Sequence, residues 1–138
     1  GTADVSSFLV LPDLIEYMDR IVPGGWPEIL FHNRELALKG RALLCRELGA
    51  EPPCPDSMIA SLAAVPIADR TPEEAALPTR YHDALQDRLI ANWGIQAPIV
   101  VFPRDTHRRM IRIAAQVYNS IEQVEYLTRA LREELGRG

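Results

Sequence analysis

The sequence has few of the residues on which common catalytic and scaffold motifs depend. It contains two cysteines, three histidines and, among its 15 basic residues, one lysine, Lys39. Cys45 and Cys54 are too few for a disulfide scaffold and do not form a C-x-x-C pair, which favours reduced thiols in a cytoplasmic protein, although a bridge between them stays open. The histidines lie far apart and lack metal-ligand spacing, so no metal site is expected.

Other absences narrow the class of protein. No apolar run approaches the roughly 20 residues that span a bilayer, so no membrane segment is expected. The net charge of -4 means that the chain has no excess of basic residues to attract nucleic acid. No G-x-S-x-G, G-x-G-x-x-G or P-loop motif occurs. What remains is a chain of 138 residues, 47% hydrophobic and 25% charged, which is typical of one folded domain with a core.

The N-terminal part is predicted to be helical. Apolar residues recur at helical spacing over residues 11–21, and a longer helix is predicted over residues 27–48, ended by Gly49. Gly40 lies within the apolar stripe of the longer helix, where it would let another element approach closely. The charged residues of this helix, Arg41 among them, are expected to be mostly solvated.

The rest of the chain alternates strands and helices. The expected elements are a strand over residues 58–65, a short turn at 72–76 with a Thr71–Glu74 capping box, a helix over 81–93, a strand over 97–102, a hairpin loop at 103–107, a strand from Arg109, and a last helix capped by Asn119 or Ser120. This order predicts an α+β fold, in which a small antiparallel sheet of about three strands has helices packed on one side. We expect residues 1–50 to form an N-terminal helical segment and residues 51–138 the α+β domain.

The strand that begins at Arg109 carries a second arginine in its middle. Two-residue alternation places Met110, Arg112, Ala114 and Gln116 on one face, so one guanidinium interrupts an otherwise apolar strand. A buried charge without a partner is costly, so Arg112 is expected to meet an anion. A structural ion pair, or an arginine that reaches out to water, explains the same pattern.

Several sequence runs together resemble one enzyme family. They are R-I-A-A-Q-V-Y-N at residues 112–119, G-T-A-D at 1–4, M-I-A-S-L-A-A-V-P at 58–66 and G-I-Q-A-P at 94–98. In this order they resemble the class V aminotransferase-like enzymes, and within them the isopenicillin N epimerase-like branch. Ala114 stands where that pattern more often has serine.

The resemblance implies a fold-type I pyridoxal-phosphate enzyme, of which this chain would be the C-terminal small domain. The lysine that forms the Schiff base belongs, in that family, to a large domain that precedes these motifs, and Lys39 is not at the matching position. The start at Gly1, without an initiator methionine, is expected to be a cut inside a longer protein. The chain alone should then be inactive and bind no pyridoxal phosphate, while its parent forms a homodimer.

The resemblance also implies roles for three residues. Arg112 would bind the carboxylate of a small amino-acid-like substrate, Gln116 would orient it, and Thr2 would contact the cofactor phosphate. It does not choose between epimerisation, transamination and C–S lysis. The alternative is a free-standing α+β ligand-binding or regulatory module, without catalytic activity, that senses an anion through Arg112.

Overall fold

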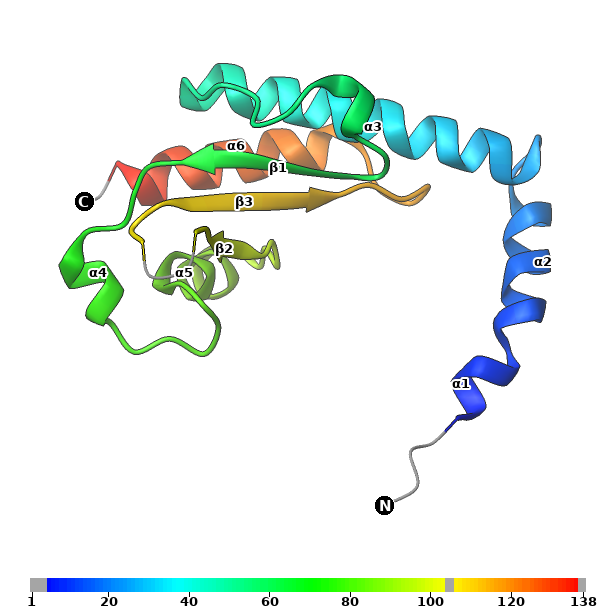
Figure 1. Ribbon diagram of the computed structural model, residues 1–138, viewed down its shortest axis with the longest axis horizontal. Helices are drawn as coiled ribbons and strands as arrows, with labels where there is room; N and C mark the ends of the chain where they lie inside the picture. The colour runs from blue at the N-terminus through cyan, green and yellow to red at the C-terminus, as the bar shows by residue number, and fades with distance from the viewer. Residues whose placement is uncertain (1–4, 104–105, 137–138) are drawn as a thin grey trace.

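The computed structural model describes residues 5–103 and 106–136, which form six α-helices, a short 3₁₀ turn and a three-stranded sheet (Figure 1). In chain order the elements are α1 (Ser6–Leu9), α2 (Leu11–Ile21), α3 (Gly25–Leu48), the 3₁₀ turn η1 (Asp56–Met58), β1 (Leu62–Ile67), α4 (Pro72–Ala76), α5 (Ala84–Trp93), β2 (Ile99–Val101), β3 (Arg109–Ala114) and α6 (Ile121–Leu135). The sheet is antiparallel with the order β1-β3-β2. The predicted α+β fold is confirmed.

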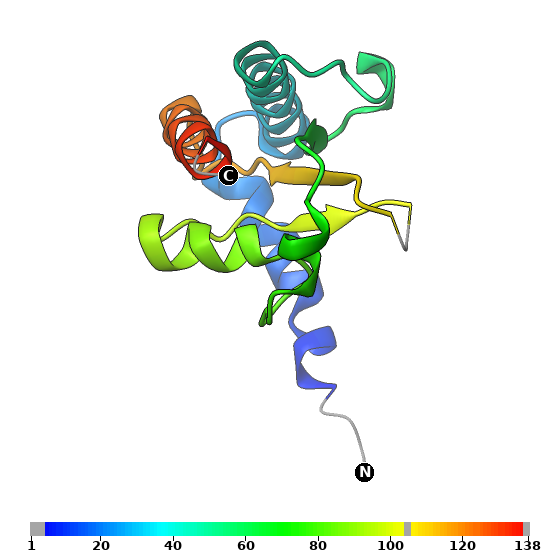
Figure 2. The same cartoon turned by 90° about the vertical axis from the view of Figure 1, so that its left-hand side faces the viewer.

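The sheet has one covered face and one open face. Val65, Ile99 and Ile111 are fully buried in a core that includes residues of α3, α5 and α6. Figure 2 shows how these helices and the strands are arranged. On the opposite face Leu62 is 49% exposed and Val100 is 38% exposed. The alternation of buried and exposed residues therefore leaves one side of the sheet without helices, as predicted.

Helix α3 packs tightly against the sheet and α6 at Gly40. A Cβ atom at this position would lie 2.9 Å from Cδ1 of Ile113 and 3.2 Å from Cγ2 of Val124. Such a side chain would have to displace atoms of a packed core, which is costly. The expectation that Gly40 permits a close approach is confirmed.

The first strand differs from the predicted one. Residues 56–58 form the turn η1 after a proline-rich connector, so β1 begins at Leu62 and not at residue 58. It also continues through Pro66, which was expected to end it. Since β1 is an edge strand and the amide of Ala115 binds the carbonyl of Ser61, alternation directs the nitrogen of Pro66 away from β3, where no donor is needed.

Local capping sets the start of three helices. The Thr71–Glu74 capping box of α4 is formed as predicted. Helix α5 begins later than predicted, because the Asp83 carboxylate accepts a hydrogen bond from the amide of Leu85 at 2.9 Å and so caps it. Helix α6 is capped by Ser120, one of the two expected residues, with a capping box to its third residue.

One arginine of α3 is buried, contrary to expectation. Arg41 is 3% exposed; its Nη1 donates to the carbonyl oxygen of Cys54 at 2.8 Å, and its Nη2 pairs with Asp56. These bonds satisfy the charge inside the protein, because Arg41 faces the connector that follows α3 and not solvent. Both cysteines are free, so no Cys45–Cys54 bridge exists in the structure.

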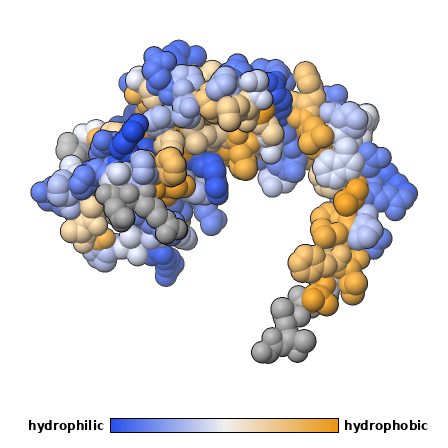
Figure 3. Space-filling model, viewed as in Figure 1, coloured by the Kyte–Doolittle hydropathy of each residue, from blue (hydrophilic) through white to orange (hydrophobic). Residues whose placement is uncertain are grey.

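Helices α1 and α2 form an arm that projects from the body (Figure 1). Neither helix contains a buried residue, and Phe8, Leu9 and Tyr17 are each more than 60% exposed. Figure 3 shows hydrophobic colours concentrated along this arm. The Trp26 indole nitrogen donates to the carbonyl oxygen of Ile15 at 3.0 Å and joins the arm to α3. The predicted domain boundary near residue 50 stays a prediction, while α3 supplies part of the core.

Candidate functional site

Arg112 lies on the open face of the sheet. It is exposed, whereas its strand neighbour Ile111 is fully buried. The register places Ala64 opposite Arg112, and Met110 and Ala114 share its face of β3. Within the described residues, no hydrogen bond or ion pair engages the guanidinium. A free guanidinium among small or apolar neighbours is available to an anionic ligand, and its exposure removes the cost of burial.

The buried arginine of β3 is Arg109. Its Nη1 lies 3.0 Å from Oδ1 of Asp83, its Nη2 lies 3.2 Å from Oε2 of Glu74, and its Nε donates to the carbonyl oxygen of Ala68 at 2.7 Å. All three donor nitrogens are therefore engaged, which gives Arg109 a structural role. Sequence reasoning overlooked it, although alternation places Arg109 on the same face as the buried Ile111.

The ion pairs of Arg109 continue into a network that joins four elements. Glu74 also pairs with Arg88 of α5 at 3.3 Å, and Nε of Arg88 lies 3.0 Å from Oε2 of Glu134 in α6. Oε1 of Glu134 accepts hydrogen bonds from Asn92 and from the indole of Trp93, both at 3.0 Å. The network links α4, α5 and α6 to the N-terminal end of β3. Its positive and negative groups pair with one another.

Glu74 gives this network a pH dependence. Burial opposes ionisation of Glu74, but hydrogen bonds with Thr71 and the guanidiniums of Arg109 and Arg88 outweigh it and hold the pKa below its ordinary value of 4.5. A group whose folded-state pKa is lowered contributes stability above its unfolded pKa and loses it as the pH falls through the folded one. The wild-type chain should therefore lose this contribution below about pH 4.5.

Replacing Glu74 with glutamine tests this dependence. At pH 7 the variant should be less stable by about 1–2 kcal/mol, because two guanidiniums lose a charged acceptor. The difference should shrink as the pH falls from 7 to below about 4.5, through the folded-state pKa of Glu74. Urea denaturation followed by circular dichroism across this pH range measures the difference, with Glu125→Gln, which changes an exposed carboxylate of α6, as the control. A stability gap that does not change with pH would contradict the proposed ionisation.

Gln116, which was predicted to orient Arg112, faces Asn33 of α3. Oε1 of Gln116 accepts hydrogen bonds from Nδ2 of Asn33 and from the amide of Val117, both at 2.9 Å. Asn33, on α3, is 4% exposed and was not singled out in the sequence. The structure therefore places Gln116 against α3, and its role in orienting Arg112 stays a prediction. Thr2 lies outside the described residues.

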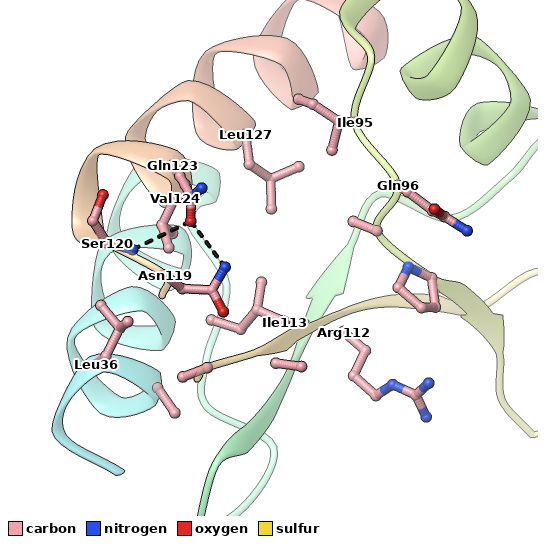
Figure 4. Close-up of a pocket in the computed structure, with 15 residues that line it drawn as sticks. Leu36, Ile95, Gln96, Arg112, Ile113, Asn119, Ser120, Gln123, Val124 and Leu127 are labelled. Atoms are coloured by element: carbon pink, nitrogen blue, oxygen red, sulfur yellow. Dashed lines mark hydrogen bonds between the residues drawn. The ribbon is translucent and has the colours of Figure 1, made fainter. Parts of the chain in front are cut away.

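A cleft lies beside the C-terminal end of β3 (Figure 4). Its volume is about 230 Å³. Figure 4 shows the guanidinium of Arg112 pointing away from the space between Asn119 and Gln96. The cleft is bounded by β3, the start of α6, part of α3 and the segment before β2; its residues are Leu36, Ala37, Ile95, Gln96, Ala97, Pro98, Arg112, Ile113, Ala114, Ala115, Asn119, Ser120, Gln123, Val124 and Leu127.

Two further kinds of site were sought in the described part of the chain. Among residues 5–103 and 106–136, no three histidine, cysteine or acidic residues are grouped so that they hold a metal ion. In the same ranges no helix is both long and apolar enough to cross a membrane. Arg112 and the cleft are candidates for binding a ligand other than a metal ion.

Comparison with known proteins adds one similarity. No protein-family model matches the chain. The chain is 30% identical, over 140 aligned residues, to the probable L-cysteine desulfhydrase, chloroplastic, of Arabidopsis thaliana. The alignment covers 95% of this chain and 28% of the plant protein. The chain therefore spans less than a third of the length of the relative that it matches, and is similar to one part of a longer protein.

Proposed function

We propose that this chain is the C-terminal small domain of a pyridoxal-phosphate-dependent enzyme, in which Arg112 binds the carboxylate of an amino-acid substrate. The observation that carries the proposal is the free guanidinium of Arg112 on the open sheet face. It belongs to a chain that is similar, along 95% of its length, to a protein named for the desulfhydration of L-cysteine. The class V aminotransferase-like motif around Arg112 supports the same assignment.

The surroundings of Arg112 suit a carboxylate. A planar guanidinium matches the two oxygens of a carboxylate with parallel hydrogen bonds, and such a pair fixes the orientation of the substrate as well as its position. The neighbouring Ala64 and Ala114 carry no charge that competes for the guanidinium, and their small side chains leave room around it. Arg112 therefore acts by binding and orientation.

The reaction that fits the similarity best is cleavage of a carbon–sulfur bond in L-cysteine or a related amino acid. This choice follows the name of the plant relative. The motif resemblance is compatible with it, because C–S lysis is one of the reactions between which the resemblance does not choose. Epimerisation, which the isopenicillin N epimerase-like branch would imply, is the narrower alternative. Product analysis separates the two, since only cleavage releases sulfide.

The position of Lys39 supports a cofactor site in another part of the parent protein. Lys39 is exposed on α3, and α3 packs on the face of the sheet opposite to Arg112. The cofactor, which supplies an electron sink when bound, therefore belongs to another part of the parent protein in this proposal, and we assign it no step here.

The exposed arm provides the surface for that other part. Its large apolar side chains are between 41% and 76% exposed; they are Val5, Phe8, Leu9, Val10, Leu11, Leu14, Ile15, Tyr17 and Ile21. A contiguous apolar surface of this kind marks a protein–protein or interdomain contact. We assign this surface to a contact with the large domain of the parent protein. The resemblance also implies that the parent is a homodimer.

A single preparation of the parent protein tests the proposed function. The full-length gene product should show an absorbance band at the edge of the visible range that borohydride removes, and it should release sulfide from L-cysteine. The 138-residue chain, assayed beside it, should show neither. A full-length protein without the band, or with the band but no reaction on amino acids, would overturn the proposal.

A further inference from the structure

The edge of β3 that faces β2 is only partly paired. Register places Pro98 opposite Arg112, and the amide of Arg112 donates to the carbonyl oxygen of Pro98 at 3.0 Å. In an antiparallel ladder the two residues of such a pair exchange both hydrogen bonds. Proline has no N–H to return, so the carbonyl oxygen of Arg112 receives no bond from β2.

The next backbone group along this edge is the amide of Ala114. The amide of Ala115 binds Ser61 in the direction of β1, so alternation turns Ala114 toward the side of β2. The β2 ladder has already ended at Ile99, and within the described residues no hydrogen bond reaches the Ala114 amide. A backbone acceptor and a backbone donor thus stand side by side on an uncovered edge.

These two backbone groups border the cleft at the end of β3. Ile113, Val124 and Leu127 supply apolar surface, while Gln123 supplies an uncharged polar group (Figure 4). The cleft of about 230 Å³ exceeds the ~150 Å³ of an apolar cavity that accepts benzene. It has space for one amino-acid side chain, and the guanidinium of Arg112 points elsewhere.

We propose that this cleft binds a neutral, peptide-like ligand that carries one apolar side chain. The ligand's N–H would donate to the carbonyl oxygen of Arg112, and its C=O would accept from the amide of Ala114. That spacing is the one by which a single residue of a parallel strand pairs with an edge, as in β-strand addition. The side chain would fill the apolar part of the cleft. The site uses neither the guanidinium of Arg112 nor any cofactor, so its test does not depend on the proposed function.

Titration of the ¹⁵N-labelled 138-residue chain with N-acetyl-L-leucinamide tests the site. Saturable shifts are expected at the backbone amide of Ala114 and at the side-chain amide of Gln123. The matched ligand carries a methyl group on the leucine nitrogen and cannot donate to Arg112, so it should bind at least tenfold more weakly. Equal binding of the two ligands, or no saturable shift at Ala114, would overturn the proposal.

A substitution at the edge provides the matched protein control. Ala114→Pro removes the donor, and its nitrogen faces away from β1, so the β1–β3 ladder is kept. It should weaken N-acetyl-L-leucinamide at least tenfold, while Ala114→Val, which keeps the amide, should retain more of the binding. If Ala114→Pro fails to fold, the comparison of the two ligands on the wild-type chain still tests the proposal. Equally tight binding of isobutanol, which has no amide, would mean an apolar cavity only and would overturn the assignment to the strand edge.

Discussion

Replacing Arg109 with alanine is expected to lower the free energy of unfolding by about 3–5 kcal/mol, a large part of the about 5–15 kcal/mol that is typical of a folded protein. The substitution leaves the carboxylate of Asp83, whose side chain is 2% exposed, without its cation. It also deprives Glu74 of one guanidinium and the carbonyl of Ala68 of its donor. An unpaired buried charge costs more than the pair contributes, so one substitution removes much of the stability.

Two comparisons separate this effect from a general sensitivity of β3. Arg112→Ala, three residues along the same strand, should change stability by less than about 0.5 kcal/mol, because that side chain is exposed and engages no described residue. Arg109→Met combined with Asp83→Asn should be less harmful than Arg109→Ala, since it removes both charges. Urea denaturation of the three variants measures both differences. Equal losses for Arg109→Ala and Arg112→Ala would contradict the distinction.

The two arginines also show how far the sequence alone leads. Alternation in β3 correctly separates the face of Ile111 from the face of Arg112, because the side-chain direction of a strand has a period of two. It does not say which face the helices will cover. The sequence left open whether Arg112 meets an anion, forms an ion pair or reaches water; in the structure Arg109 is the buried arginine and Arg112 is exposed.

Local signals were the most reliable part of the fold. The capping box of Thr71 and Glu74, the helix end at Gly49 and the close approach at Gly40 depend on residues near in sequence or on the absence of a side chain. The contact of Asn33 with Gln116 joins positions 83 residues apart, and no periodicity in either segment indicates it. Long-range polar contacts of this kind require the tertiary fold.

Pro66 and Pro98 illustrate a related limit. In the sequence, Pro66 was expected to end a strand because proline removes a backbone donor, and Pro98 was noted as part of a family motif. The structure shows which hydrogen bond is lost in each case. At Pro66 the missing donor faces the outer edge of β1, where it leaves nothing unpaired, whereas at Pro98 it leaves the carbonyl of Arg112 without a partner from β2. The consequence of a proline depends on strand order and register, which composition does not contain.

If the parent protein is the amino-acid enzyme proposed above, its Arg112→Lys variant should have a kcat/KM at least tenfold lower for the amino-acid substrate, with unchanged stability. Lysine keeps the positive charge but replaces a planar pair of donors by a single ammonium group, so the two parallel hydrogen bonds to the carboxylate are lost. Tenfold corresponds to about 1.4 kcal/mol of transition-state stabilisation, within the range of one charge-assisted hydrogen bond. The fold should tolerate the change, since the side chain is exposed.

Steady-state kinetics, with thermal unfolding measured on the same preparations, tests this expectation. The matched control is Arg108→Lys, which changes a second exposed arginine just before β3 and should leave kcat/KM near the wild-type value. Equal losses in both variants would mean that the effect is not specific to Arg112, since both substitutions keep the positive charge. Wild-type turnover by Arg112→Lys would remove the bidentate contact from the site. A selective loss at Arg112 that persists in high salt is what direct carboxylate binding requires, because only a short contact that excludes solvent resists screening.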